Sequence, residues 1–277
     1  MSKTILQGLI GAWCPSLGPS GYTLLDRSGR GNHGTLTNMD AGTDWVGSPG
    51  GWALDFDGVN DFVSYGTQID LAGAKLVTIS AWVWRATLGI MMPFVRYVNT
   101  STLGANRRAD GMLVSSDGSL YVAVQAATAG GGDYTEITST SKIIAGQWNL
   151  ITCSMLIDGA STAAQWVLNG IPVTTTVTNT GTPPTQWEAN VSTAPYTSMR
   201  SISGSGTTSY WSGRLDEVAA WRRRLTTPEM QQLYQAGRGG LGRLLTPQRR
   251  SYAFRVPTAV KSYLFTNRGQ VIGGGTL

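Results

Sequence analysis

The sequence predicts an all-β fold, a two-sheet antiparallel sandwich with one short helix near its C-terminal end and an extended C-terminal arm. Short apolar or alternating segments recur along the chain and are separated by turn residues, which is typical of sandwiches. Glycine accounts for 36 of the 277 residues and charged residues for only 13%, which indicates many turns and an uncharged polar surface. Only residues 227–237 have the three- and four-residue apolar spacing of a helix.

The predicted strands are spread over most of the chain. Asp117-Gly118 and Asn169-Gly170 are strong hairpin turns, and Gly58-Val59-Asn60 predicts a third hairpin between its flanking strands. Residues 178–196 are rich in Thr and Pro and read as a long loop. The expected strands are residues 9–13, 22–25, 33–37, 52–57, 62–65, 76–84, 91–98, 111–115, 120–126, 148–157, 166–169, 171–176, 198–203 and 210–221.

The last strand leads into the helix. Thr227 is the expected N-cap, Pro228 suits the first helical position, and Glu229 lies where the helix dipole favours a negative charge. Met230 and Leu233 begin one apolar face, and Gly237 predicts a left-handed C-terminal cap. The helix is therefore expected to pack on the sandwich through one side only.

Three segments resemble laminin-G-like, concanavalin A-like jelly-roll domains. They are L-I-G-A-W with D-R-S-G-R-G-N-H-G-T-L (9–13 and 26–36), W-A-L-D-F-D-G-V-N-D-F-V (52–63) and G-R-L-D-E-V-A-A-W-R-R-R-L-T-T-P-E-M (213–230). They occur in the order of that family and cover about residues 6–237. The resemblance implies a jelly-roll sandwich over residues 1–237, followed by an extension over residues 238–277. One fold hosts many activities, so it does not specify the function.

The sequence does not predict an enzyme. Glucanases of this fold carry paired carboxylates on one strand, because retaining hydrolysis needs two carboxyls about 5 Å apart. Asp216 and Glu217 are adjacent, so on a regular strand they would face opposite sides, and the resemblance implies a structural role for them. His33 is the only histidine and lies in a turn, and the chain's two cysteines are far apart, which argues against a catalytic triad and against zinc.

A calcium site is one interpretation of the residues around the third predicted turn. Asp55, Asp57, Asn60 and Asp61 offer four oxygen-bearing side chains within seven residues, and hard cations prefer oxygen ligands. The alternative is that these side chains cap their own turn.

A glycan site is a second interpretation, based on aromatic residues in loop-like contexts. The sequence holds ten tryptophans, and aromatic rings with a polar tip suit binding surfaces as well as cores. Packing is the alternative for each of these residues. The candidate ligand-binding residues are Trp45, Trp187, Tyr196 and Trp211.

The extension, residues 238–277, holds seven basic residues and no acidic one, whereas the rest of the chain has 14 bases and 16 acids. It is also too apolar for a plain disordered tail. We expect it to lie on its own sandwich or on a protein partner, either another subunit or a virion shell. There is no nucleic-acid recognition motif. The candidate partner-binding residues are Arg238, Arg243, Arg249, Arg250, Tyr252, Phe254, Arg255, Lys261, Phe265 and Arg268.

The N-terminal residues have no secretory signal pattern, and no apolar run reaches the roughly 18 residues of a membrane span. The sequence therefore predicts synthesis in a cytoplasm and no membrane insertion. The leading interpretation is a non-enzymatic structural or interaction protein on a virion surface, such as a capsid decoration protein, that forms an oligomer through its arm. The alternative is a carbohydrate-binding or cell-surface adhesion module.

Overall fold

The computed structural model describes residues 3–66, 69–97, 109–126, 133–187, 195–202, 208–246, 261–265 and 271–276. The chain forms two compact units, Met1–Thr246 and Pro247–Leu277. The described part of the second unit is a two-stranded antiparallel sheet of β20 (Lys261–Phe265) and β21 (Val271–Thr276). The boundary between the units therefore falls after Thr246, nine residues later than the sequence suggested, because residues 238–246 pack with the sandwich.

One sheet of the sandwich, sheet A, has eight strands. Its strand order places the N-terminal β1 and the late β19 side by side through antiparallel pairing. The order is β14 (Ile171–Val173), β13 (Ala163–Leu168), β12 (Trp148–Leu156), β7 (Leu76–Trp84), β19 (Ser212–Trp221), β5 (Gly51–Asp57) and β4 (Trp45–Ser48), with β1 (Leu9–Trp13) on β19.

The other sheet, sheet B, has nine strands, again antiparallel. A short hairpin of β17 (Arg200–Ile202) and β18 (Thr208–Tyr210) follows β16. The order is β15 (Thr175–Thr180), β11 (Tyr134–Lys142), β10 (Ser119–Gln125), β9 (Ala109–Val114), β8 (Met91–Tyr97), β16 (Tyr196–Ser198), β6 (Phe62–Gly66), β3 (Gly34–Thr37) and β2 (Thr23–Leu24).

The core lies between the two sheets. Alternate strand residues point inward, and stacked aromatic rings fill the centre: Phe94 lies 4.7 Å from Tyr196 and 5.8 Å from Trp13, measured between ring centroids. The two-sheet antiparallel sandwich that the sequence predicts is confirmed. Strands β10 and β11 of sheet B bury alternate residues, as an alternating pattern requires, whereas β7, β12 and β19 of sheet A are buried on both faces.

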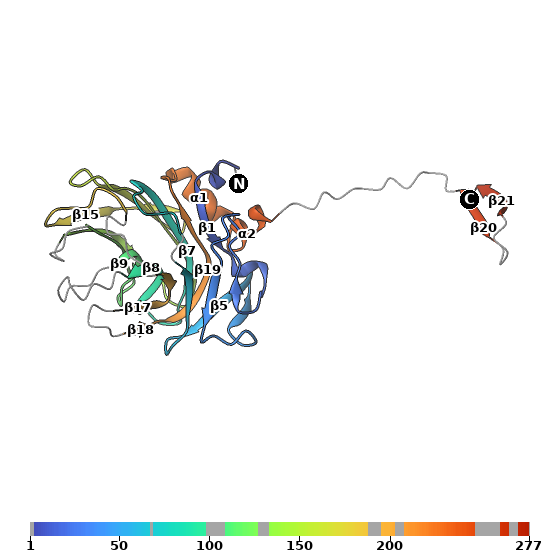
Figure 1. The fold of residues 1–277 in the computed structure, drawn as a ribbon, viewed down its shortest axis with the longest axis horizontal. Helices are drawn as coiled ribbons and strands as arrows, with labels where there is room; N and C mark the ends of the chain where they lie inside the picture. Colours follow the sequence, from blue (N-terminus) through green and yellow to red (C-terminus); the bar gives the residue numbers. More distant parts are fainter. Residues whose placement is uncertain are drawn as a thin grey trace. The chain divides into compact units, whose positions relative to one another are not determined.

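A second apolar cluster covers the outer face of sheet A. Trp82, Leu150 and Trp221 from the sheet pack against Met230 and Leu233 of helix α1 (Thr227–Gln235). The 3₁₀ turns η1 (Lys3–Leu6) and η2 (Pro15–Leu17) and helix α2 (Gly240–Leu245) complete this layer. Figure 1 shows α1 and α2 beside β1, whereas β8, β9 and β15 lie on the opposite side of the sandwich. The outer face of sheet B has no helix over it in the described part of the chain.

Helix α1 begins one residue earlier than the sequence suggested. Thr226, not Thr227, is the N-cap: its hydroxyl accepts from the Glu229 N–H, and the Glu229 carboxylate accepts from the Thr226 N–H, which is a capping box. The Arg223 guanidinium also binds Glu229 at 2.8 Å, and these contacts lower the pKa of Glu229 to about 2. Gly237 has the left-handed φ of 71° expected of the C-terminal residue.

Several local predictions are confirmed and others are wrong. The hairpins at Asp117-Gly118 and Asn169-Gly170 form as expected. The predicted hairpin at Gly58-Val59-Asn60 does not pair, because β5 belongs to sheet A and β6 to sheet B, so the turn carries the chain from one sheet to the other. Strands β4 and β11 and helix α2 were not predicted.

Candidate functional site

The adjacent acids Asp216 and Glu217 do not face opposite sides as predicted. The register between β19 and β7 shifts at Asp216/Ala219, and Glu217 adopts a left-handed φ of 46°. This bulge turns both carboxylates outward from sheet A, beneath η2 and α2. Their exposed fractions are 0% and 4%, so neither carboxylate is within reach of a substrate in solution.

Both carboxylates hold the C-terminal part of the sandwich in place. Asp216 accepts from the backbone N–H of Ser16 at 3.0 Å and from Arg238 at 2.9 Å. Glu217 accepts from the backbone N–H of Gly242 in α2 at 2.8 Å. Burial, followed by the charge of Asp216, raises the pKa of Glu217, so this side chain keeps its proton to higher pH than an ordinary glutamate does.

Arg238 is a core residue, which corrects its predicted role in partner binding. Its side chain is 4% exposed, pairs with Asp216 and donates to the backbone carbonyls of Trp52 and Gly51 at 2.9 and 3.1 Å. Its guanidinium also lies 4.5 Å from the ring centre of Trp148. Arg243 is exposed on α2. The side chains of the other predicted arm residues, 249–268, lie outside the described part of the structure.

Three of the four aromatic residues predicted to bind a ligand are also core residues. Trp187 and Tyr196 are fully buried, and Trp45 is 5% exposed. Each indole finds an internal acceptor: Trp187 Nε1 donates to the Tyr196 hydroxyl at 2.9 Å, and Trp45 Nε1 donates to the Gly21 carbonyl at 3.1 Å. All three side chains belong to the main apolar cluster between the sheets, which a loop-like composition does not reveal. Trp211 alone is only partly buried.

Three of the four residues predicted to bind calcium, Asp55, Asp57 and Asp61, use their carboxylates in local contacts. Asp57 accepts from the N–H groups of Val59 and Asn60 at 2.7 and 3.3 Å, and Asp55 pairs with Arg214 at 3.1 Å. Asp61 accepts from the Asp57 N–H at 3.0 Å. In the described part of the chain, no three His, Cys, Asp or Glu side chains are grouped to hold a metal. Calcium binding stays a prediction.

Asp61 gives this corner a pH dependence. Burial and the nearby carboxylates of Asp57 and Asp44 raise the pKa of Asp61 to about 6, whereas an unfolded Asp titrates at about 3.9. Its stabilisation is therefore complete below about pH 4 and is lost as the pH rises through about 6. We expect Asp61→Asn to remove this dependence and to raise the unfolding free energy by about 1–2 kcal/mol at pH 7.5.

Urea unfolding at pH 4, 6 and 7.5 measures this difference. Asp57→Asn is the matched control, because hydrogen bonds from Val59, Asn60 and Asp61 outweigh burial and lower the pKa of Asp57. That variant should lose stability at pH 7.5. The difference in unfolding free energy between the wild type and Asp61→Asn should change between pH 4 and pH 7.5. If this difference is the same at both pH values, the raised pKa of Asp61 is contradicted.

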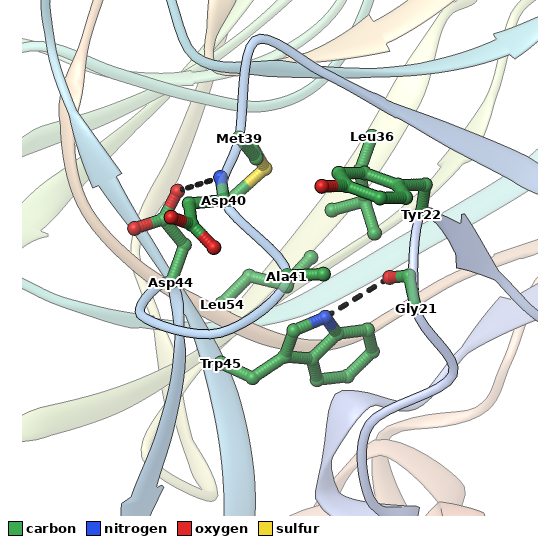
Figure 2. Close-up of a pocket in the computed structure, with 9 residues that line it drawn as sticks. All are labelled: Gly21, Tyr22, Leu36, Met39, Asp40, Ala41, Asp44, Trp45 and Leu54. Atoms are coloured by element: carbon green, nitrogen blue, oxygen red, sulfur yellow. Dashed lines mark hydrogen bonds between the residues drawn. The ribbon is translucent and has the colours of Figure 1, made fainter.

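A small pocket lies between the segment before β2 and the loop before β4. Tyr22, Leu36, Met39, Ala41 and Trp45 line it, and the space between the lining residues is about 140 Å³, part of which is open to solvent. Figure 2 shows the Asp40 and Asp44 carboxylates on the far side of the loop from Tyr22, where Asp44 accepts from the Asp40 N–H. Typical ligand pockets hold roughly 300–1,000 Å³, so this space is too small for a sugar or cofactor.

The outer face of sheet B carries a different set of polar and aromatic side chains, which we call the sheet B face. Cross-strand pairing aligns Tyr121 with Thr138 and Thr176, and aligns Glu136 with Thr178. The inward neighbours of these residues are core, and strand geometry therefore places this set outward. The sheet B face consists of Tyr121, Tyr134, Glu136, Thr138, Thr176 and Thr178, which are half-buried or exposed.

The side chains of the sheet B face are available to a ligand. Among the described residues, neither the Glu136 carboxylate nor the hydroxyls of Tyr121 and Tyr134 have a side-chain partner. Three strands at about 4.8 Å spacing and four residues along β11 give a patch of about 10 by 13 Å. An apolar border adjoins it, since Leu113 pairs with Tyr121 and packs with Trp211 against Met92 and Val95.

The Laminin_G_3 family model, described as the concanavalin A-like lectin/glucanases superfamily, matches residues 57–231, more than half of the chain. The chain belongs to this superfamily. The match begins at the corner between β5 and β6 and ends within α1, so it includes the bulge at Asp216 and Glu217. It therefore confirms the resemblance inferred from the motifs. No curated protein matches the sequence.

Solved structures similar to this lectin/glucanase-like chain are distant in sequence. The binding domain of Paraclostridial Mosquitocidal Protein 1 is 14% identical with a TM-score of 0.55, over 84% of this chain and 53% of that chain. The binding domain of botulinum neurotoxin DC, in complex with rat synaptotagmin II, is 12% identical with a TM-score of 0.50, over 94% and 55%. Trypanosoma rangeli sialidase in complex with 2,3-difluoro-KDN is 14% identical with a TM-score of 0.52, over 83% and 32%.

These likenesses establish the lectin-like fold alone. The chain spans between about a third and about half the length of those proteins. No helix in the described ranges is both long enough and apolar enough to cross a membrane.

Sequence reasoning missed the sheet B face because β11 was not recognised as a strand. Its sequence, Y-T-E-I-T-S-T-S-K, has few apolar residues, although Thr135, Ile137 and Ser139 alternate inward. That alternation around Ile137 is the signal that could have revealed it.

Proposed function

We propose that the chain is a non-enzymatic binding module of the lectin-like class that takes a glycan on the sheet B face. The observation that carries this proposal is the set of polar groups that have no side-chain partner among the described residues, beside two tyrosine rings. They lie on the face of the sandwich that the described helices leave uncovered. Aromatic rings offer an apolar surface to a sugar, while Glu136 and the threonine hydroxyls offer hydrogen-bond acceptors and donors.

A binding role without catalysis is favoured by the positions of the carboxylates. Asp216 and Glu217 are the only adjacent pair of acids in the sequence, and both are committed to backbone and Arg238 contacts beneath α2. Glu136 stands on β11 without a neighbouring carboxylate among its cross-strand partners, Ala123 and Thr178. Retaining and inverting glycosidases both need two carboxyls. The similarity to two binding domains of toxins agrees with this proposal.

A glycan array probed with the chain ending at Thr246 tests the proposal. We expect Tyr121→Ala to weaken retention about fivefold or more, because stacking on one aromatic ring supplies roughly 1 kcal/mol or more of affinity. Tyr22→Ala is the matched control: Tyr22 is 61% exposed and directly precedes β2, which lies at the other end of sheet B from β15, so this variant should bind normally. Equal retention of both variants, or no retention of the intact protein on any glycan, would contradict the proposal.

A second candidate role is that of a structural protein on a virion surface, made in a cytoplasm and attached through residues 247–277. This second unit holds five bases, Arg249, Arg250, Arg255, Lys261 and Arg268, and no acid, whereas residues 1–246 hold 16 of each. A separate basic unit joined to an electrically neutral sandwich suits attachment to an acidic protein shell or to another copy. A virion protein of this kind could also bind a glycan.

We expect a chain ending at Thr246 to fold as a soluble monomer but not to join particles or oligomers. The truncation keeps α2, because ending at Gly237 would remove Arg238 and Gly242 and leave the buried carboxylates of Asp216 and Glu217 without their partners. Light scattering and co-sedimentation with particles measure the two properties. Normal incorporation of the chain ending at Thr246 would refute the attachment role.

A further inference from the structure

Strand β15, Thr175–Thr180, is the edge strand of sheet B. It lacks the features that normally prevent an edge strand from pairing with another chain. It pairs with β11 on one side, and no described strand pairs with its other side. Its sequence, T-T-V-T-N-T, holds no charge, no proline and no glycine, and four of its residues are threonines. Natural edges are normally blunted by lysines, prolines, bulges or short length, so an unblunted six-residue edge indicates a place where another strand adds.

The hydrogen-bond pattern fixes which residues of β15 are open. The Thr140 N–H donates to the Thr174 carbonyl at 3.2 Å, which makes that pair a hydrogen-bonded one in the register of β11 with β15. Hydrogen-bonded and non-hydrogen-bonded pairs alternate along an antiparallel ladder. Thr176, Thr178 and Thr180 therefore bond to β11, whereas Thr175, Val177 and Asn179 direct their N–H and C=O groups outward.

The other edges of the sandwich are poorer acceptors. Strand β14 has three residues and contains Pro172, which lacks an N–H, and β2 has two residues. Strand β4 has four residues, including Gly47. Strand β1 is fully buried, and its Ala12 N–H already binds the Asp26 carboxylate at 3.0 Å. Among the described strands of the sandwich, β15 is therefore the one with a long, regular and open edge.

The second unit supplies a matching donor. Strands β20 and β21 pair only with each other among the described residues, and a lone two-stranded hairpin is marginally stable in water. Strand β20, K-S-Y-L-F, has strand-forming residues and no glycine, whereas β21 holds three consecutive glycines. Strand β20 has five residues, close to the six of β15. The fourteen residues 247–260 can span at most about 46–50 Å, which sets an upper limit on the distance between the sandwich of one copy and the edge strand that its hairpin would join.

We propose that β20 of one copy adds to the β15 edge of a second copy, so that the C-terminal hairpin extends sheet B of its neighbour. This inference rests on the attachment role proposed above and names the surface that receives the second unit. Because the donor and acceptor surfaces differ, the contact is head-to-tail and generates a ring or a filament rather than a closed two-fold dimer. Each added strand is held by backbone hydrogen bonds along β15.

Light scattering of the full chain and of Val177→Pro tests the proposal. Proline at Val177 removes one outward N–H and leaves the bonds to β11 intact, and edge strands tolerate proline. We expect the full chain to have at least twice the monomer mass and Val177→Pro to be a monomer. The matched control Val177→Thr keeps the N–H and should still assemble. Asn179→Pro removes another outward N–H. If Val177→Pro is too unstable to test, Asn179→Pro should likewise be a monomer.

Mixing two assembly-defective chains gives the sharpest outcome. Val177→Pro still carries a hairpin, and the chain ending at Thr246 still carries an open β15 edge, so together they should form a one-to-one complex of two chains. A full chain that is monomeric at 100 micromolar, or assembly unaffected by both proline variants, would overturn the proposal. Particle incorporation that is lost on truncation at Thr246 but kept in Val177→Pro would overturn this inference while leaving the attachment role in place.

Discussion

Asp216→Ala is expected to cost about 3–5 kcal/mol of unfolding free energy, because removing one partner of a buried ion pair leaves the other charge uncompensated. Asp216 is fully buried, and the Arg238 side chain that it pairs with is 4% exposed. Asp216 also accepts the N–H groups of Ser16 and Glu217, which lose their acceptor in the variant. Urea unfolding at pH 7 measures the loss.

Two further variants separate charge from packing. Asp216→Ala combined with Arg238→Met should be less destabilising than the sum of the two single changes, since neither charge is then left alone. Glu217→Gln should cost less than about 1 kcal/mol at pH 7, because its raised pKa already favours the neutral form and glutamine can still accept from Gly242.

The pH dependence gives a second readout for Glu217. Its folded pKa is raised, so its stabilisation is complete below about pH 4.3, the ordinary value, and is lost as the pH rises through the folded pKa. Glu217→Gln should therefore gain stability relative to the wild type at pH 9. A cost for Glu217→Gln as large as that for Asp216→Ala at pH 7 would contradict the proposed division of roles.

Trp187→Ala is expected to cost about 3–5 kcal/mol, as other buried tryptophan deletions do. Trp187 is fully buried, its indole donates to Tyr196, and its backbone bonds to Gly73 and Ala74 on both sides. The variant loses this packing and leaves the Tyr196 hydroxyl without its donor. Thermal unfolding measures the effect.

Trp52→Ala is the control for this substitution, because Trp52 is 40% exposed, and it should change the unfolding free energy by less than about 1 kcal/mol. Trp187→Phe keeps most of the ring packing and isolates the hydrogen bond. A Trp187→Ala chain that melts like the wild type but no longer binds a glycan would restore the ligand-binding role first inferred from the sequence.

Much of the fold could be predicted from the sequence because short residue patterns specify its strands and hairpins. Alternation in β7 and β12 and the turns at Asp117-Gly118 and Asn169-Gly170 each specify a strand or a hairpin from a few residues. The family motifs around Asp216 added the order of the sandwich. The N-cap was misplaced by one residue because Thr226 and Thr227 are chemically equivalent in sequence, and only the Glu229 contact selects between them.

The candidate site was less readable because it depends on tertiary structure. Whether the turn after Asp57 closes a hairpin or crosses between sheets depends on strand partners far along the chain. Asp216 and Glu217 both point outward because of a β-bulge, and no residue pattern in the sequence predicts this bulge. Trp187 and Tyr196 lie in polar surroundings in sequence, yet both are fully buried in the core between the sheets. The sheet B face draws on β10, β11 and β15, whose alignment exists only in the folded sheet.

The central claim is that the sheet B face takes the ligand, and an amide NMR titration of residues 1–246 with the best glycan from the array tests it most directly. We predict that the largest shift changes fall on β10, β11 and β15, around Tyr121, Glu136 and Thr178. Changes confined to the pocket at Tyr22, or to the strands of sheet A, would contradict the claim.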